Sequence, residues 1–166
     1  TKSNIYLILG TAATLSQEYQ VLEADNPTGN FRMFQPRERK LEFDISHYGD
    51  KWYIRTNKDD AQNFKIMVTP ETATTKENWT DLMPYDKNIL VEGIDIFKDH
   101  MVISERKEGI TQLRIRPWDG KNEHYIEFGE ASYTTGTGIN PEFETDLLRL
   151  EYTSLTTPNS TYDYNV

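Results

Sequence analysis

The chain has 166 residues, of which 36% are hydrophobic and 27% charged, and its formal net charge is −9 at pH 7. This composition fits a soluble globular protein with one ordinary core and argues against a disordered chain. The longest purely apolar run ends at Leu9 and is far shorter than the roughly 20 residues of a membrane span, so no membrane partner is expected. Nucleic acid is excluded as a partner because no basic stripe is present. The scattered acids predict a solvated surface, with an acidic cleft for cationic ligands as the alternative.

The chain contains no cysteine, which excludes disulfides and thiolate metal sites. It begins with Thr1 and enters a strand pattern almost at once, with no leader before it, so we expect a piece of a longer protein. We expect a soluble protein located in the cytoplasm or the periplasm. The glycosylation patterns at Asn78 and Asn159 are of a kind that arises often by chance, and they carry no prediction.

Short segments rich in β-branched and aromatic residues, bounded by turn clusters, predict an all-β chain. Three strands are predicted first, near 4–10, 17–24 and 31–35. Four follow at 41–48, 51–57, 64–69 and 78–82. Four more lie at 89–97, 100–106, 111–117 and 123–128. The last three are predicted near 132–138, 147–154 and 160–165.

One strand recurs along the chain at a nearly constant spacing of 47, 49 and 47 residues. Its four copies are Ile5-Tyr6-Leu7, Trp52-Tyr53-Ile54, Met101-Val102-Ile103 and Leu148-Arg149-Leu150. Four strands per unit of about 40–50 residues is the spacing of a β-propeller blade, whose inner strands are covered on both faces. We therefore predict a partial β-propeller of about three and a half four-stranded antiparallel blades, in units near 1–35, 41–82, 88–128 and 131–166. The residues expected in the interior are Trp52, Ile54, Met101 and Ile103. A β-sandwich with accidental regularity is the alternative.

No catalytic, cofactor-binding or metal-binding set is predicted. The nucleophile motif Gly-x-Ser-x-Gly is absent, and no serine has a plausible histidine partner. His47, His100 and His124 stand at strand ends far apart, so structural or solvent-facing roles are expected. Gly136-Thr137-Gly138 predicts a strand-end bend rather than a phosphate cradle, and the acids of residues 141–146 predict a solvated loop rather than a cation site. We expect the three tryptophans to anchor the packing between blades rather than to stack on a ligand: Trp52, Trp79 and Trp118.

Residues 29–67 read GNFRMFQPRERKLEFDISHYGDKWYIRTNKDDAQNFKIM. This segment resembles the propeller of the prolyl oligopeptidase family, and within it the oligopeptidase B (protease II) branch. Residues 88–115 and 133–165 resemble it as well, so the resemblance spans essentially the whole chain. Its most specific parts are His47-Tyr48, residues 53–57, Asn63-Phe64, Asn140-Pro141-Glu142 and residues 154–158, SLTTP.

The resemblance implies a seven-bladed propeller that covers the active site of an α/β-hydrolase domain with a Ser-Asp-His triad. Such an enzyme admits only short peptides and, in this branch, cleaves after Lys or Arg. The hydrolase domain and the earlier blades are expected outside this chain, so no triad residue carries over and the fragment is expected to be inactive. No cofactor is implied.

The partners that follow are short basic peptides through the full-length enzyme, the hydrolase domain of the same chain, and further copies of the fragment. Copies would pair through an edge strand or, alternatively, approximate a full ring. Two other classes stay open: a freestanding binding propeller, and a secreted sandwich domain that binds carbohydrate.

Overall fold

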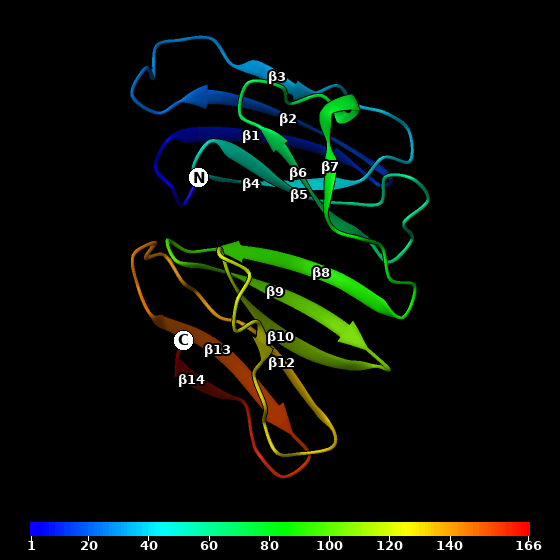
Figure 1. Cartoon of the computed structure of the whole chain (residues 1–166), viewed down its shortest axis with the longest axis vertical. Coiled ribbons are helices and arrows are strands. Elements are labelled where there is room, and N and C mark those ends of the chain that lie inside the picture. Colours follow the sequence, from blue (N-terminus) through cyan, green and yellow to red (C-terminus); the bar gives the residue numbers. More distant parts are fainter. The chain divides into compact units, whose positions relative to one another are not determined.

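Four separate antiparallel sheets make up the computed structural model, which describes residues 1–166 (Figure 1). Within each sheet, neighbouring strands are consecutive in the chain. The chain divides into two compact units, Thr1–Lys87 and Asn88–Val166, and each unit contains two of the sheets.

The first unit contains a sheet of three strands and a sheet of four. The three-stranded sheet consists of β1 (Tyr6–Ala13), β2 (Ser16–Glu23) and β3 (Arg32–Gln35). The four-stranded sheet consists of β4 (Phe43–Tyr48), β5 (Lys51–Thr56), β6 (Lys65–Pro70) and β7 (Thr80–Met83), with the 3-10 helix η1 (Lys76–Asn78) before β7.

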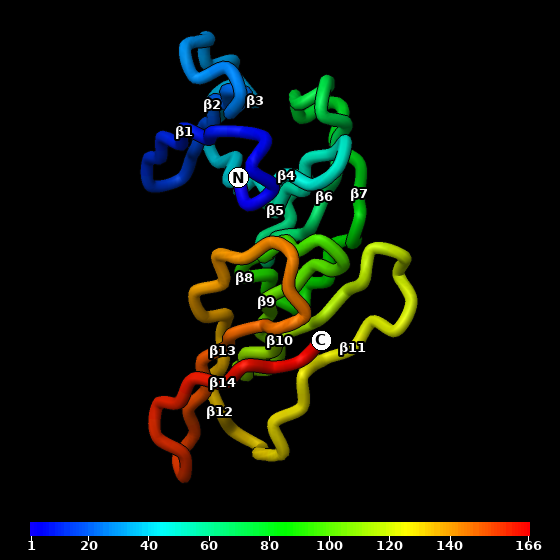
Figure 2. Tube along the Cα trace, turned by 90° about the vertical axis from the view of Figure 1, so that its left-hand side faces the viewer, coloured from blue at the N-terminus to red at the C-terminus, as the bar shows by residue number.

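The second unit repeats this composition in the opposite order. Its four-stranded sheet consists of β8 (Ile89–Ile96), β9 (His100–Lys107), β10 (Ile110–Pro117) and β11 (His124–Tyr125). Its three-stranded sheet consists of β12 (Tyr133–Thr137), β13 (Leu147–Ser154) and β14 (Ser160–Asn165). The yellow segment between β10 and β12 runs mostly outside regular structure, with β11 as its only strand (Figure 2).

The predicted strands are confirmed, and their ends differ from the observed ends by at most three residues. The largest difference in length concerns the strand predicted at 123–128, because β11 pairs with β10 only at His124 and Tyr125. The backbone N–H of Ile126 still donates to the carbonyl of Leu113 at 3.0 Å, and the chain then leaves the ladder. The all-β fold predicted from alternation is therefore observed.

The tight hairpins follow from their turn residues. Lys107 pairs with Ile110, so Glu108 and Gly109 form a two-residue loop between β9 and β10. Both residues have a positive φ, 51° for Glu108 and 84° for Gly109, as a type I′ turn requires. This turn matches the right-handed twist of the strands and fixes the pairing of β9 with β10.

In the first unit the two sheets share one aromatic core. The ring of Trp52, on β5, lies 5.0 Å from that of Tyr6 and 5.1 Å from that of Phe34, both on the three-stranded sheet. Trp79 packs on Phe43 at 5.3 Å in the same cluster. Trp52 therefore anchors the packing of one sheet on the next, as predicted.

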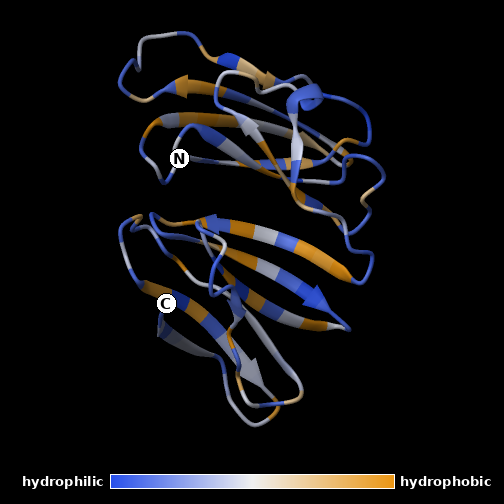
Figure 3. Cartoon of the chain, viewed as in Figure 1, coloured by the Kyte–Doolittle hydropathy of each residue, from blue (hydrophilic) through white to orange (hydrophobic).

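The second unit has an equivalent core between its two sheets. Leu148 and Leu150 from β13 pack against Leu113 and Ile115 from β10. Hydrophobic and hydrophilic residues alternate along both β10 and β13 (Figure 3). Alternation places one face of each strand in this core, which is the pattern expected of a half-buried strand.

The repeated strand occupies equivalent places in both units. Burial is confirmed for the residues predicted to be interior, each of which is 0% exposed: Trp52, Ile54, Met101 and Ile103. In the first copy, by contrast, Ile5 and Leu7 are 48% and 45% exposed, whereas Tyr6 is buried. Trp52 and Leu148 face the sheet that precedes their own in the unit. Ile5 has the same repeat position at the start of the first sheet, which has no predecessor in this chain, and its side chain is not covered.

Candidate functional site: an acidic groove lined by aromatic rings

His47 is buried and bridges two other segments of the first unit. Its Nδ1 lies 2.9 Å from the Ser3 hydroxyl, and its Nε2 lies 3.2 Å from Oε1 of Glu71. The same Oε1 accepts a hydrogen bond from the Tyr6 hydroxyl at 2.6 Å. The prediction that no serine has a histidine partner is therefore wrong. Ser3 is 44 residues from His47 in the chain, and no motif marks this long-range pairing.

The surroundings of His47 favour a structural role for this cluster. Burial lowers the pKa of His47 by more than the neighbouring Glu71 carboxylate raises it, so the ring is neutral at pH 7. The ring is 3% exposed and lies 4.9 Å from that of Tyr6 and 4.8 Å from that of Trp52. Acyl transfer needs a histidine beside a space that substrate can enter, and aromatic rings fill the space around His47.

The other histidines and the acidic loop considered from the sequence are also dispersed. His100 is buried with its ring stacked on Phe97 at 4.6 Å, and His124 is exposed with Nε2 3.1 Å from the Tyr164 hydroxyl. The acids of residues 141–146 lie in the loop between β12 and β13, where Glu144 forms an ion pair with Lys98 at 2.7 Å. No group of three or more His, Asp or Glu side chains is arranged to hold a metal ion.

Glu130 organises the hairpin between β13 and β14. Its Oε1 accepts hydrogen bonds from the hydroxyls of Tyr152 at 2.7 Å, Ser154 at 3.0 Å and Thr157 at 3.3 Å. Its Oε2 accepts one from Thr156 at 2.9 Å. The Tyr152 hydroxyl, followed by those of Ser154 and Thr156, holds the pKa of Glu130 below its usual range, so this carboxyl is ionised at neutral pH.

A groove of about 430 Å³ lies beside Glu130, between the segment that follows β11 and strands β13 and β14. Four of its lining residues are aromatic: Phe128, Tyr152, Tyr162 and Tyr164. The Phe128 and Tyr152 rings are stacked at 4.8 Å, and Tyr162 meets Tyr152 edge-on at 6.2 Å. The remaining lining residues are Ile126, Glu127, Leu150, Thr157 and Asp163. The hairpin at the edge of this groove is drawn in orange-red and red in Figure 2.

The electrostatic character of this region is acidic. Residues 122–166 contain eight acidic side chains and a single basic one, Arg149. Arg149 forms a two-pronged pair with Asp163, with Nε and one terminal nitrogen at 2.8 and 2.9 Å from the two carboxylate oxygens. This pair lowers the pKa of Asp163. Because Arg149 is the single basic residue of 122–166, no other acid of this segment can pair with a lysine or arginine from within it.

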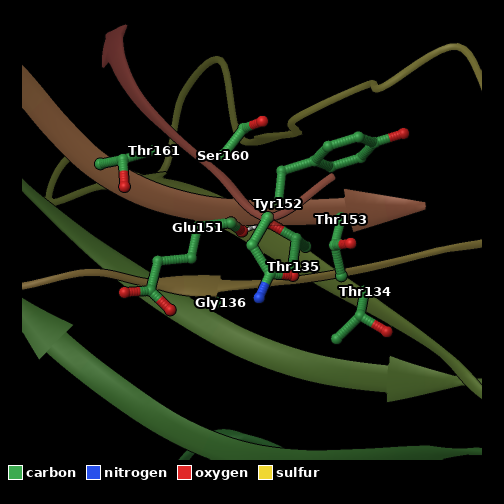
Figure 4. Close-up of a pocket in the computed structure, with 9 residues that line it drawn as sticks. Thr134, Thr135, Gly136, Glu151, Tyr152, Thr153, Ser160 and Thr161 are labelled. Carbon is green, nitrogen blue, oxygen red and sulfur yellow. Dashed lines mark hydrogen bonds between the residues drawn. The ribbon is translucent and has the colours of Figure 1, made fainter. Parts of the chain in front are cut away.

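A second hollow, of about 400 Å³, lies on the last sheet and is lined by residues of all three of its strands (Figure 4). Figure 4 shows the side chains of Glu151 and Tyr152 on opposite sides of β13, as alternation requires. Gly136 contributes to the space because a Cβ there would meet nothing within 4 Å. The lining is rich in hydroxyl groups, from Thr134, Thr135, Thr153, Ser160 and Thr161, and holds no charged pair.

Comparison with known proteins identifies the family. Residues 1–166 match the model for "Prolyl oligopeptidase, N-terminal beta-propeller domain" over their full length. The chain belongs to this family. The predicted partial β-propeller is thereby confirmed, and the β-sandwich alternative is wrong. No helix of this propeller chain is long and apolar enough to cross a membrane.

Named relatives of this propeller are peptidases. Dipeptidyl aminopeptidase BI of Pseudoxanthomonas mexicana is 37% identical over 165 residues, covering 99% of this chain and 22% of the relative. Protease 2 of Moraxella lacunata is 22% identical over 166 residues, covering 100% of this chain and 23% of the relative. The chain thus spans less than a quarter of the length of these relatives.

The solved structures agree with the family assignment. Oligopeptidase B from Trypanosoma brucei, in a closed form with covalently bound antipain, superposes with a TM-score of 0.91 at 26% identity. The match covers 100% of this chain and 25% of that protein. Oligopeptidase B from Leishmania major superposes with a TM-score of 0.88 at 22% identity, which shows the same fold.

Proposed function

We propose that this chain is the substrate-gating propeller portion of a serine oligopeptidase that cleaves short peptides after Lys or Arg. The observation that carries this proposal is the full-length match to the propeller-domain family, supported by the similarity to an oligopeptidase B that carries antipain covalently. The catalytic triad and the specificity pocket are assigned to a hydrolase domain elsewhere in the parent protein. That domain and short basic peptides are the proposed partners.

The proposed mechanism is steric. A closed propeller over an active site leaves a passage that a flexible peptide can enter, whereas a folded protein is too wide. Enclosure also excludes bulk water from the reaction and commits the bound peptide to it. The net charge of −9 is compatible with basic substrates, because an acidic surface raises the local concentration of cations.

The parent protein tests this proposal directly. We expect it to hydrolyse a short chromogenic peptide with a single Arg and to leave the same Arg sequence uncut within a folded protein. We also expect a Gly-x-Ser-x-Gly motif downstream in the reading frame. A parent without that motif and without hydrolysis would favour the alternative, a freestanding binding propeller.

The isolated chain is proposed to be inactive. Pure protein incubated with the chromogenic peptide should give no turnover. The Ser3→Ala variant is the appropriate control, because Ser3 is the serine bonded to His47. Turnover that follows the protein peak on repurification and disappears in Ser3→Ala would contradict the proposal.

Self-association is proposed for the isolated chain. The first sheet carries large apolar side chains on the surface, each between 41% and 48% exposed: Ile5, Leu7, Leu9, Phe31 and Met33. A contiguous apolar patch of more than a few hundred Å² commonly recruits a partner. An unpaired strand edge offers a second route, through backbone hydrogen bonds.

A further inference from the structure

We propose that the groove beside Glu130 binds the guanidinium group of an arginine side chain in a peptide. The proposal concerns this chain alone and does not depend on the proposed function. It rests on the pairing of a fixed carboxylate with aromatic walls in a groove of about 430 Å³. Neither of the hollows described above was singled out by any sequence motif.

The carboxylate of Glu130 is ionised and fixed, but no cation neutralises it. All four of its hydrogen-bond donors are neutral hydroxyls, and neither lysine nor arginine forms an ion pair with it. Glu105, in the same unit, shows the contrasting case, because it lies 3.0 Å from the guanidinium of Arg114 and accepts from the Tyr125 hydroxyl at 2.8 Å. The negative charge of Glu130 is therefore not neutralised by any cation of the chain, and the carboxylate lines the groove.

The acceptor geometry of Glu130 leaves room for a ligand. A carboxylate offers about four lone-pair positions, about two on each oxygen. Three hydroxyls converge on Oε1, but Oε2 accepts only from Thr156. One position on Oε2 is therefore available to an N–H donor. The hydroxyl bonds fix the carboxylate beforehand, which lowers the entropic cost of binding a cation.

The aromatic walls favour guanidinium over a compact ammonium group. A planar guanidinium stacks on aromatic faces while its N–H groups reach a carboxylate in the same plane. Tyr162 lines the groove, is 48% exposed and meets Tyr152, a donor to Glu130, edge-on at 6.2 Å, so exposed aromatic surface borders the groove close to Glu130. Charge complementarity points the same way, since Glu127 is a further exposed lining acid that forms no ion pair.

The test uses the 166-residue chain and two small probes. Nα-acetylarginine amide carries the guanidinium, and Nα-acetylcitrulline amide replaces it with a neutral group of nearly the same shape. Titrations followed by backbone amide NMR shifts should show binding of the arginine probe, with shifts centred on Glu130 and the hairpin. We expect the citrulline probe to bind at least about tenfold more weakly, because a charge-assisted hydrogen bond is lost.

Three variants separate binding from folding. Glu130→Gln should weaken the arginine probe by at least about tenfold. Because this change also loosens the hairpin, Tyr162→Leu provides a second variant that leaves the bonds of Glu130 intact, with an expected loss of about two- to fivefold. The matched control is Glu142→Gln, at an exposed acid outside the groove, which should leave the affinity unchanged.

Several results would overturn the proposal. Equal affinity for the two probes would show that no charge is recognised, and shifts centred away from Glu130 would place the site elsewhere. A larger loss in Glu142→Gln than in Glu130→Gln would indicate nonspecific attraction to an acidic surface. A dimer that buries Tyr162 and dissociates in Tyr162→Leu would show that a second copy, and not an arginine side chain, occupies the groove.

Discussion

Truncation of Leu148 to Ala is a sharp test of the packing between the two sheets of the second unit. Leu148 is 0% exposed and lies in the core that joins β13 to the four-stranded sheet. The change removes three carbon atoms, worth about 2.4 kcal/mol of transfer free energy at about 0.8 kcal/mol each. The cavity adds to this cost, so the free energy of unfolding should fall by about 2–5 kcal/mol. Ile103→Ala, at an equally buried repeat position, should fall in the same range.

Leu147 provides a matched control for this prediction. It precedes Leu148 on β13 but faces the opposite side and is 51% exposed. Leu147→Ala removes the same atoms from the same strand, leaves no cavity, and should cost no more than about 1 kcal/mol. Urea unfolding of both variants, followed by circular dichroism with a common slope, measures the difference. Equal costs, or a larger cost at Leu147, would refute the assignment of the two faces of β13.

Three further predictions follow from single contacts. Lys58→Ala should change the free energy of unfolding in urea by no more than about 0.5 kcal/mol. Asp59→Ala should cost more, because Asp59 pairs with the buried Lys65 at 3.0 Å, and equal costs for the two variants would contradict this. Because burial lowers the pKa of His47, the free energy of unfolding should fall as the pH drops below about 6.5, where the unfolded chain takes up the proton first. His47→Gln should remove that part of the slope in urea titrations between about pH 7 and pH 5, and an unchanged slope would argue against a buried neutral ring. Leu9→Glu should weaken self-association in light scattering over an about hundredfold dilution, whereas a monomer at every concentration of the unmodified chain would disprove the association.

The strands were predictable because each has to bury one face, and burial leaves a mark on the local sequence. Leu148, Arg149 and Leu150 show this clearly, with 0% and 1% exposure for the two leucines and an exposed arginine between them. The recurrence of the same strand at a spacing of 47 to 49 residues then indicated repeated sheets. The length of β11 was less predictable, because alternation marks the buried face and not the number of ladder hydrogen bonds.

The contacts of Glu130 and His47 could not be predicted in the same way. The four hydroxyl donors to Glu130 lie 22 to 27 residues away in the chain, in and after β13. Ser3 and Glu71 lie 44 and 24 residues from His47. None of these spacings corresponds to the 47- to 49-residue repeat. Serine and threonine are also common in turns because their hydroxyls hydrogen-bond to the nearby backbone, so their presence does not indicate a distant partner. The residues that meet at these places become apparent only once the strands are folded.

Packing and charge are distributed differently in the two units, although both are built from one three-stranded and one four-stranded sheet. Residues 1–87 contain 13 acidic and 11 basic side chains, whereas residues 88–166 contain 14 acidic and seven basic ones. The first unit is therefore almost balanced and carries its exposed apolar side chains on the open face of the first sheet. The open face of the last sheet carries Arg149, Glu151 and Asp163 beside the single apolar Leu147. On β13 the repeat positions Leu148 and Leu150 specify packing, so the charged residues of this strand lie on the face that is free of that constraint. Salt should accordingly weaken cation binding to the second unit while leaving the apolar association of the first intact.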